Sequence, residues 1–186
     1  MAFDEEEFRK VIVGELNPLE GRVVLVDYDP EWPALFSRES NRIRAALGER
    51  ALLVEHTGST SVPGLVAKPI IDILLVVPNS ADEDSYVPGL EKFGYVLRVR
   101  EPDWHEHRMF RSPDMETHLH VFSEGCLEIG RILGFRDWLR THSEDRELYA
   151  SAKKGLSRKD WKYMQNYADA KTDVIEAIIA RSQMHR

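Results

Sequence analysis

Apolar residues form one continuous run and several stretches with helical spacing. The run from Ile70 to Val77 is apolar at every position except Asp72, which indicates a strand buried on both faces of a sheet. From Trp32 onward apolar residues recur at helical spacing, with Asp29-Pro30 as the expected start and Gly48 as the expected end. Further strands are expected over residues 22–26, 52–55, 95–100, 107–111 and 117–122.

The rest of the pattern is helical, and it is concentrated in the last third of the chain. Helices are expected over residues 3–16, 81–93 and, in three segments, 127–181. The expected ends or breaks lie at Asn17-Pro18, Pro88-Gly89, His142-Ser143 and residues 155–157. Strands followed by helices predict one α/β or α+β domain over residues 1–186. Its sheet-containing core would occupy residues 1–126, and a helical extension would occupy residues 127–186.

Composition narrows the class of protein. The 186 residues, 42% hydrophobic and 31% charged, are typical of a globular chain with one core. A net charge of −7 argues against binding extended nucleic acid, although a few clustered lysines and arginines can still bind a small anion. Cys126 is the single cysteine, which excludes an internal disulfide and a cysteine-based zinc site. The acidic start and the absence of a long apolar run predict a cytoplasmic protein without membrane contact. Oligomeric state is not indicated.

The stretch from Glu55 to Val77 carries the most specific chemistry. Gly58-Ser59 follows an expected strand, and a polar loop leads from it to the strand that contains Asp72. In nucleotidyl transfer, backbone amides and a hydroxyl at a tight glycine turn can hold phosphate oxygens. A carboxylate on the adjacent strand can hold Mg²⁺ against those oxygens. The pattern therefore favours a site for nucleotide phosphates and a divalent metal.

The chain resembles the GrpB family, bacterial proteins within the nucleotidyltransferase superfamily of the polymerase-β type. The motifs that carry the resemblance are HTGSTSVP at 56–63, KPIID at 68–72, His107-Arg108, HLHV at 118–121, FRD at 135–137, Tyr167 and Lys171. The resemblance covers nearly all of the chain from about Val24. It implies a nucleotidyltransferase-like mixed sheet flanked by helices, and a metal-dependent transferase that acts on an NTP and a small acceptor. Relatives fused to dephospho-coenzyme A kinase also suggest a coenzyme-like ligand.

The candidate site residues fall into three groups. The candidates for phosphate or substrate binding are Gly58, Ser59, Thr60, Ser61, Lys68, Arg108, Arg136 and Lys171. The candidate metal ligands are Asp72, His118 and His120, and the two histidines share a strand face. Asp72 and His120 are the catalytic candidates, with His120 as the base or a second ligand. Mg²⁺ is the expected ion, with Mn²⁺ or Zn²⁺ as alternatives because imidazole suits them better.

One position departs from the pattern of active transferases. Those proteins typically carry two carboxylates two residues apart on the strand, and here Leu74 takes the second place after Asp72. Glu106, Asp114 and Glu116 are uncertain substitutes for a third carboxylate. Two alternatives therefore stay open. One is a catalytically reduced module that binds a nucleotide or coenzyme A, and the other is a histidine-based metal-dependent enzyme on the same fold.

Each candidate also has a purely structural interpretation. Gly58-Ser59 can be an ordinary turn, Asp72 can be a buried carboxylate that caps the loop, and Lys68 can be its ion-pair partner. His118 and His120 can face solvent on an edge strand. The arginines at 108 and 136 can form surface ion pairs.

Overall fold

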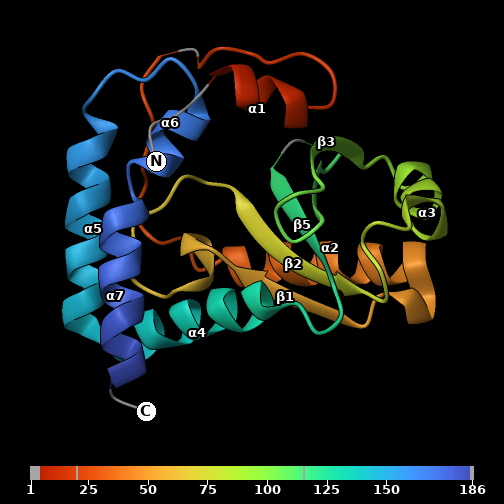
Figure 1. The fold of residues 1–186 in the computed structure, drawn as a ribbon. Helices are drawn as coiled ribbons and strands as arrows, with labels where there is room; N and C mark the ends of the chain where they lie inside the picture. Colours follow the sequence, from red (N-terminus) through yellow and green to blue (C-terminus); the bar gives the residue numbers. More distant parts are fainter. Residues whose placement is uncertain (1–4, 20, 115, 185–186) are drawn as a thin grey trace.

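A five-stranded mixed sheet forms the centre of the protein in the computed structural model, which describes residues 5–19, 21–114 and 116–184 (Figure 1). The strands are β1 (Leu53–Thr57), β2 (Ile71–Val77), β3 (Val96–Glu101), β4 (His107–Arg111) and β5 (Thr117–Ser123). Their order in the sheet is β1-β2-β5-β4-β3. The central pair, β2 and β5, is parallel, and the other three pairs are antiparallel. The expected mixed sheet flanked by helices is thereby confirmed.

Seven α-helices in the described residues surround this sheet. They are α1 (Glu5–Val11), α2 (Trp32–Leu47), α3 (Val87–Lys92), α4 (Leu127–Thr141), α5 (Ser143–Ser157), α6 (Met164–Asp169) and α7 (Thr172–Met184). In Figure 1, α4 runs beneath β1 and β2 toward α5 and α7, which stand together at one end of the sheet. None of the described helices has the length and apolar character needed to cross a membrane.

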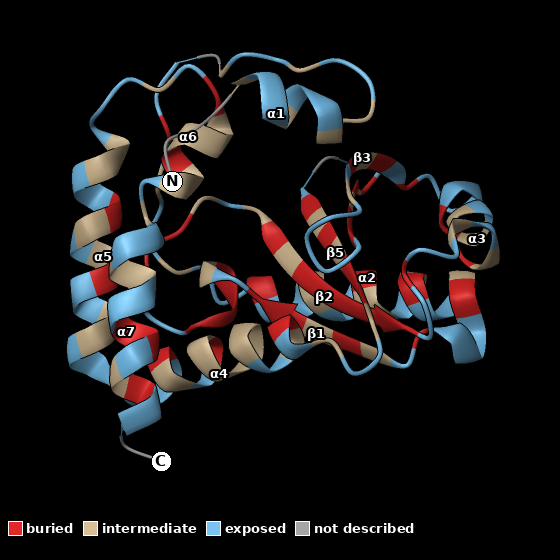
Figure 2. Ribbon diagram, in the orientation of Figure 1, coloured by how far each residue is buried: buried red, intermediate tan, exposed pale blue. Residues whose placement is uncertain are grey.

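The two faces of the sheet have different partners. On one face, Ile73 and Leu75 of β2 pack into the main apolar cluster with α2 and α3. On the other face, Leu74 and Val76 pack with Phe122 against α4. The strand β2 is therefore buried along most of its length, as its apolar pattern predicts (Figure 2). Only its amino-terminal end carries a polar side chain on the face of α4.

A third apolar cluster fastens the loop after β1 to the helices. Val62 and Leu65 of this loop pack with Leu139 of α4, Tyr149 of α5 and Ile178 of α7. The C-terminal helices therefore hold the Gly-Ser loop in place, in addition to packing on one another.

Several predicted boundaries are wrong, and each has a local reason. Residues 22–26 form no strand, and only an isolated bridge joins Val26 to Ala67. The helix expected from Asp29-Pro30 begins at Trp32, because the Asp29 carboxylate and carbonyl accept backbone N–H groups in a turn before it. Pro88 and Gly89 lie inside the first turn of α3, where proline costs no hydrogen bond.

Two predicted helical regions also differ from the structure. The first helix spans Glu5–Val11, and the start of the expected range at residues 3–4 lies outside the described residues. The C-terminal region holds four helices, because residues 158–163 and 170–171 separate α5, α6 and α7. Gly48 ends α2 with a positive φ of 57°, as predicted.

Candidate functional site

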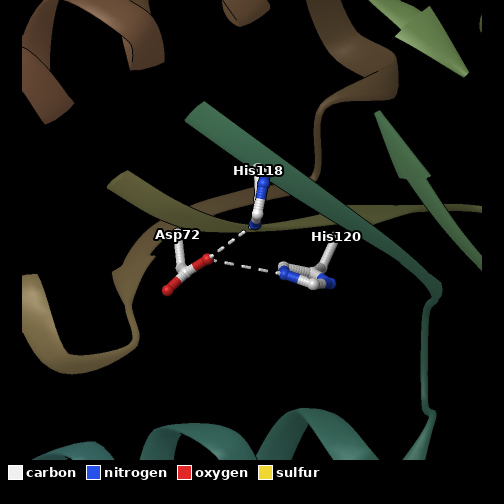
Figure 3. Close-up of side chains that lie close together, drawn as sticks. All are labelled: Asp72, His118 and His120. Carbon is white, nitrogen blue, oxygen red and sulfur yellow. Dashed lines mark ion pairs between the residues drawn. The ribbon is translucent and has the colours of Figure 1, made fainter. Parts of the chain in front are cut away.

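Asp72, His118 and His120 meet on the face of the sheet that α4 covers. Asp72 of β2 is paired in register with His118 of the parallel strand β5, so their side chains leave the sheet on the same side. Asp72 Oδ1 lies 3.5 Å from His118 Nδ1 and 3.7 Å from His120 Nε2 (Figure 3). One potential ligand atom from each residue lies within 4.8 Å of the others. β5 is the central strand, so the edge-strand interpretation of the histidines is wrong.

The protonation states of Asp72 and His118 are those that favour binding of a cation. Burial raises the pKa of Asp72, whereas the imidazoles of His118 and His120, when protonated toward it, outweigh burial and lower that pKa below its usual range. Burial lowers the pKa of His118. At neutral pH the carboxylate is therefore anionic and the His118 imidazole is neutral, which are the states in which these groups bind metals.

Gly58 is required by the closeness of Asp72. Its φ is 65°, a conformation that side chains with a Cβ rarely adopt. A Cβ at this position would overlap the Asp72 carboxylate and lie 2.8 Å from the Asp72 Cβ. The glycine thus allows the turn to press against the carboxylate, so the Gly-Ser turn and the acidic strand belong to one site.

Three lysines lie close to one another on this side of the site, and one of them contacts Ser59. Lys153 of α5 is buried and donates hydrogen bonds to Ser59 Oγ at 2.9 Å and to the Val66 carbonyl. Lys171 and Lys68 each lie near the Tyr167 ring, with Nζ 4.8 and 5.9 Å from the ring centre. Within the described part of the chain, none of these three ammonium groups lies within 4 Å of a carboxylate. Lys68 is therefore not an ion-pair partner of Asp72.

Burial disfavours the charge on each of these lysines. It lowers the pKa of Lys153 to about 7 and that of Lys171 to about 8, and in both cases a neighbouring lysine adds to the effect. Burial also lowers the pKa of Lys68. The hydroxyl of Tyr167 is buried and has no hydrogen-bond partner among the described residues. In the described part of the chain, the three lysines and the Tyr167 hydroxyl therefore have no anionic partner. An anionic ligand bound here would stabilise them.

A cavity of about 220 Å³ joins the two parts of the site. Its polar lining includes Ser59, Asp72 and Lys171. Its apolar lining comes from the loop and from α4, α5 and α7, with Val62, Ile132, Phe135, Leu139, Tyr149, Ile175 and Ile179. The structure therefore brings the carboxylate, the serine and one lysine to a common space beside the helical region.

Two residues of the Gly-Ser loop point elsewhere. Thr60 is buried, and its hydroxyl donates to the Ile70 carbonyl and also contacts His56. Ser61 donates to the Gly58 carbonyl at 2.6 Å. Both residues belong to the turn η2 (Ser59–Ser61), and both hydroxyls are thus bound to other protein groups.

The two candidate arginines are already engaged with protein groups. Arg108 is buried and donates to Glu83 at 2.5 Å, away from the cavity residues. Arg136 donates to Glu55 and Asp137, and it lines the cavity at its edge. The structure thus places Arg136 beside the site and does not place Arg108 there.

Sequence reasoning missed Lys153. The signal available in the sequence is its spacing, since Lys153 lies four residues after Tyr149 on one face of α5. Both residues are buried in the structure, so the lysine occupies a position that the helical pattern assigns to the core.

Taken together, the chain is a mixed α/β protein whose Gly-Ser turn and acidic strand share one site. Residues 22–181 match the family model described as GrpB protein. The chain therefore belongs to the GrpB family.

Relatives over the full length support this assignment. A UPF0157 protein of Halalkalibacterium halodurans is 58% identical over 178 residues, which cover 96% of this chain and 91% of the relative. The crystal structure of the conserved protein GrpB from Enterococcus faecalis matches with a TM-score of 0.75 and 32% identity. That match covers 86% of this chain and 96% of the other.

More distant matches have other names. A dephospho-CoA kinase of Mycolicibacterium paratuberculosis is 34% identical over 164 residues, which cover 74% of this chain but only 40% of the kinase. A structure of Cid1 in complex with its short product ApU matches with a TM-score of 0.49 and 12% identity, over 83% of this chain and 45% of the other. At that level the likeness carries no inference about function.

Proposed function

We propose that this protein is a metal-dependent enzyme of the nucleotidyltransferase type, acting on an NTP and a small acceptor. The observation that carries the proposal is the cavity that Ser59, Asp72 and Lys171 share. Asp72, which lies beside two imidazoles, lines this cavity together with Ser59 and Lys171, and Lys153 donates to Ser59 next to it. Metal ligands and phosphate-binding groups are the two parts that nucleotidyl transfer needs.

The phosphate part rests on lysines that are buried or half-buried and have no carboxylate partner in the part of the chain that the structure describes. The ammonium groups of Lys68, Lys153 and Lys171 have no carboxylate within 4 Å among the described residues, and an ammonium group in such surroundings is costly. A polyphosphate would supply the missing negative charge and would accept hydrogen bonds from these groups. Ser59 and the buried Tyr167 hydroxyl are further donors at this place.

The metal part rests on the donor set. The carboxylate of Asp72 and the imidazoles of His118 and His120 can converge on one ion, because their ligand atoms are already close together. A divalent ion there would screen the phosphate charges and orient the attacked phosphorus. The resemblance implies Mg²⁺, whereas two imidazoles suit Mn²⁺ or Zn²⁺ better. His120 would serve as a ligand or as the base that accepts the acceptor's proton.

A second candidate function is a module that binds a nucleotide or coenzyme A without turnover. Leu74 favours it, because this residue takes the place of the second carboxylate and is fully buried in the apolar cluster under α4. A partial relative named dephospho-CoA kinase makes coenzyme A a reasonable ligand to test.

The test combines ligand-dependent melting with turnover. NTPs and coenzyme A, each with Mg²⁺, Mn²⁺ or Zn²⁺, are screened for an increase in melting temperature, since a ligand that binds the native state stabilises it. Release of pyrophosphate from each NTP is then measured with a panel of small acceptors. We expect stabilisation and metal-dependent release, and we expect Asp72→Asn to abolish both while the protein stays folded.

The matched control is Asp84→Asn, at an exposed aspartate outside the candidate site, and it should change neither signal. Stabilisation without pyrophosphate release would support the binding module. Unchanged stabilisation in Asp72→Asn would show that this carboxylate is structural, and no stabilisation by any ligand would contradict both candidate functions.

A further inference from the structure

A chain of hydrogen bonds leads away from the metal ligand candidates on the side opposite Asp72. His120 Nδ1 lies 3.0 Å from His107 Nε2, and His107 Nδ1 lies 2.6 Å from Glu101 Oε2. The sheet places these residues side by side, because Glu101 of β3 pairs in register with His107 of β4. His107 is buried, and its ring stacks on those of His120 and Phe122.

This series of hydrogen bonds determines which nitrogen of each histidine ring carries a proton. A carboxylate only accepts hydrogen bonds, so His107 Nδ1 must be the donor to Glu101. A neutral imidazole has one N–H, so a His107 ring that donates from Nδ1 to Glu101 accepts at Nε2. His120 Nδ1 must then donate to His107. The remaining nitrogen of His120, Nε2, is left with a lone pair.

That lone pair faces another acceptor. His120 Nε2 lies 3.7 Å from Asp72 Oδ1, and neither atom has a proton to offer the other when His120 is neutral. Two acceptors that point at one another repel unless a cation lies between them. The same carboxylate oxygen lies 3.5 Å from His118 Nδ1, so a third ligand is available to such a cation.

We infer that Glu101 and His107 are positioning residues that orient His120 as an Nε2 ligand, and that the centre so formed selects a first-row transition metal ion over Mg²⁺. The inference rests on the metal site of the proposed function but not on nucleotidyl transfer. Mg²⁺ prefers oxygen ligands in a strict octahedron, whereas imidazole suits the later first-row ions such as Zn²⁺ and Co²⁺. A ligand histidine whose other nitrogen is held by an ordered partner is the usual arrangement in such sites.

The first test observes the protons directly. Two-dimensional ¹H–¹⁵N spectra of the histidine rings are recorded on the metal-free protein at neutral pH, with single histidine substitutions for assignment. We expect His107 and His120 both to be protonated at Nδ1 alone. A proton on His120 Nε2, or two protons on His107, would overturn the inference.

The second test measures metal affinity without any nucleotide. Zn²⁺, Co²⁺, Mn²⁺ and Mg²⁺ are titrated into the protein, and the visible spectrum of bound Co²⁺ reports on ligand geometry. We expect Mg²⁺ to bind far more weakly than Zn²⁺ or Co²⁺. His107→Phe keeps an aromatic ring in the stack but removes the acceptor for His120, so we expect Zn²⁺ affinity to fall about 10–100-fold and the Co²⁺ spectrum to change.

Two further variants separate orientation from packing. Glu101→Gln keeps an acceptor oxygen for His107, so we expect its affinity to lie much closer to that of the parent protein. His142→Phe, at an exposed position, is the matched control and should bind metal normally. Unchanged affinity in a folded His107→Phe, Mg²⁺ binding as tight as Zn²⁺, or no metal binding at all would each overturn the inference. Failure of pyrophosphate release alone would contradict only the proposed transfer.

Discussion

At the scale of single residues, the contact between Gly58 and Asp72 shows why the motif has its form. The glycine has a positive φ, and it faces the carboxylate so closely that a Cβ does not fit. Gly64, later in the same loop, has a φ of 79° but nothing within 4 Å of the place of its Cβ. The two glycines thus share a conformational requirement, and only Gly58 has the steric one.

This difference gives a matched pair of substitutions. We expect Gly64→Ala to cost about 1 kcal/mol of unfolding free energy, for the strained φ alone. Gly58→Ala must also displace Asp72 or the turn, so we expect it to cost roughly 2–4 kcal/mol. It should also weaken metal binding at least tenfold, because the carboxylate moves. Urea unfolding and metal titration measure both effects, and equal costs for the two variants would contradict the steric explanation.

At the scale of elements, β2 changes character along its length. Near its start, on the face that α4 covers, the strand carries Asp72, whose carboxylate lies close to the imidazoles of His118 and His120. Two residues later, Leu74 on the same face is fully buried under α4 with Val76 and Phe122. The place where active transferases carry a second carboxylate is therefore part of the core here.

Leu74→Asp tests that conclusion. In this apolar cluster the new carboxylate would be an unpaired buried charge, so we expect a loss of about 3–5 kcal/mol of stability and no gain in Mg²⁺ binding. Leu148→Asp, at an exposed position on α5, should cost less than about 1 kcal/mol. Chemical unfolding and Mg²⁺ titration provide the measurements. A stable Leu74→Asp protein that binds Mg²⁺ more tightly would instead restore the two-carboxylate transferase interpretation.

At the scale of the whole molecule, the site is assembled from both halves of the chain. Lys153 of α5 reaches Ser59 in the loop after β1, and Val62 and Leu65 of that loop pack among α4, α5 and α7. The division into a core and a helical extension at residue 126 stays a prediction. In either case, the proposed phosphate-binding residues come from the C-terminal helices as well as from the loop beside the sheet.

Lys153 and Lys171, whose pKa values burial lowers, predict opposite pH trends for binding and for stability. Their folded pKa values, about 7 for Lys153 and about 8 for Lys171, lie below the value near 10.4 of an unfolded chain. Between these values the unfolded chain binds more protons, so both groups raise the stability of the free protein as pH rises. An anionic ligand needs the protonated lysines, so its affinity should fall over the same range.

The measurement is the affinity for ATP without metal between pH 7 and 9, where the ATP phosphates stay ionised. We expect a decrease approaching roughly tenfold per pH unit for each proton that binding requires. Lys153→Met should weaken binding and flatten this dependence, whereas Lys154→Met, an exposed neighbour, should leave it unchanged. Affinity that rises with pH, or an identical profile in Lys153→Met, would remove the lysines from the binding site.

Features that depend on neighbouring residues could be predicted from the sequence. The run from Ile70 to Val77 gives a buried strand, Gly48 ends a helix, and the three strands between residues 95 and 123 are found where alternation places them. The start of α2 differs from the expectation, because a turn at Asp29 and a helix start have the same local pattern. The metal ligand candidates could be named because HLHV places two histidines on one face of a strand.

Strand order and the contacts between distant segments were decided only by the tertiary structure. The sequence does not show that β2 and β5 are parallel neighbours, and this pairing brings Asp72 within 4 Å of both histidines. Nor does it show that Lys153 lies against Ser59, 94 positions earlier. Local patterns reflect backbone geometry and burial of one segment at a time. Which segments meet depends on how the whole chain buries its apolar faces at once, and the candidate site lies where those segments meet.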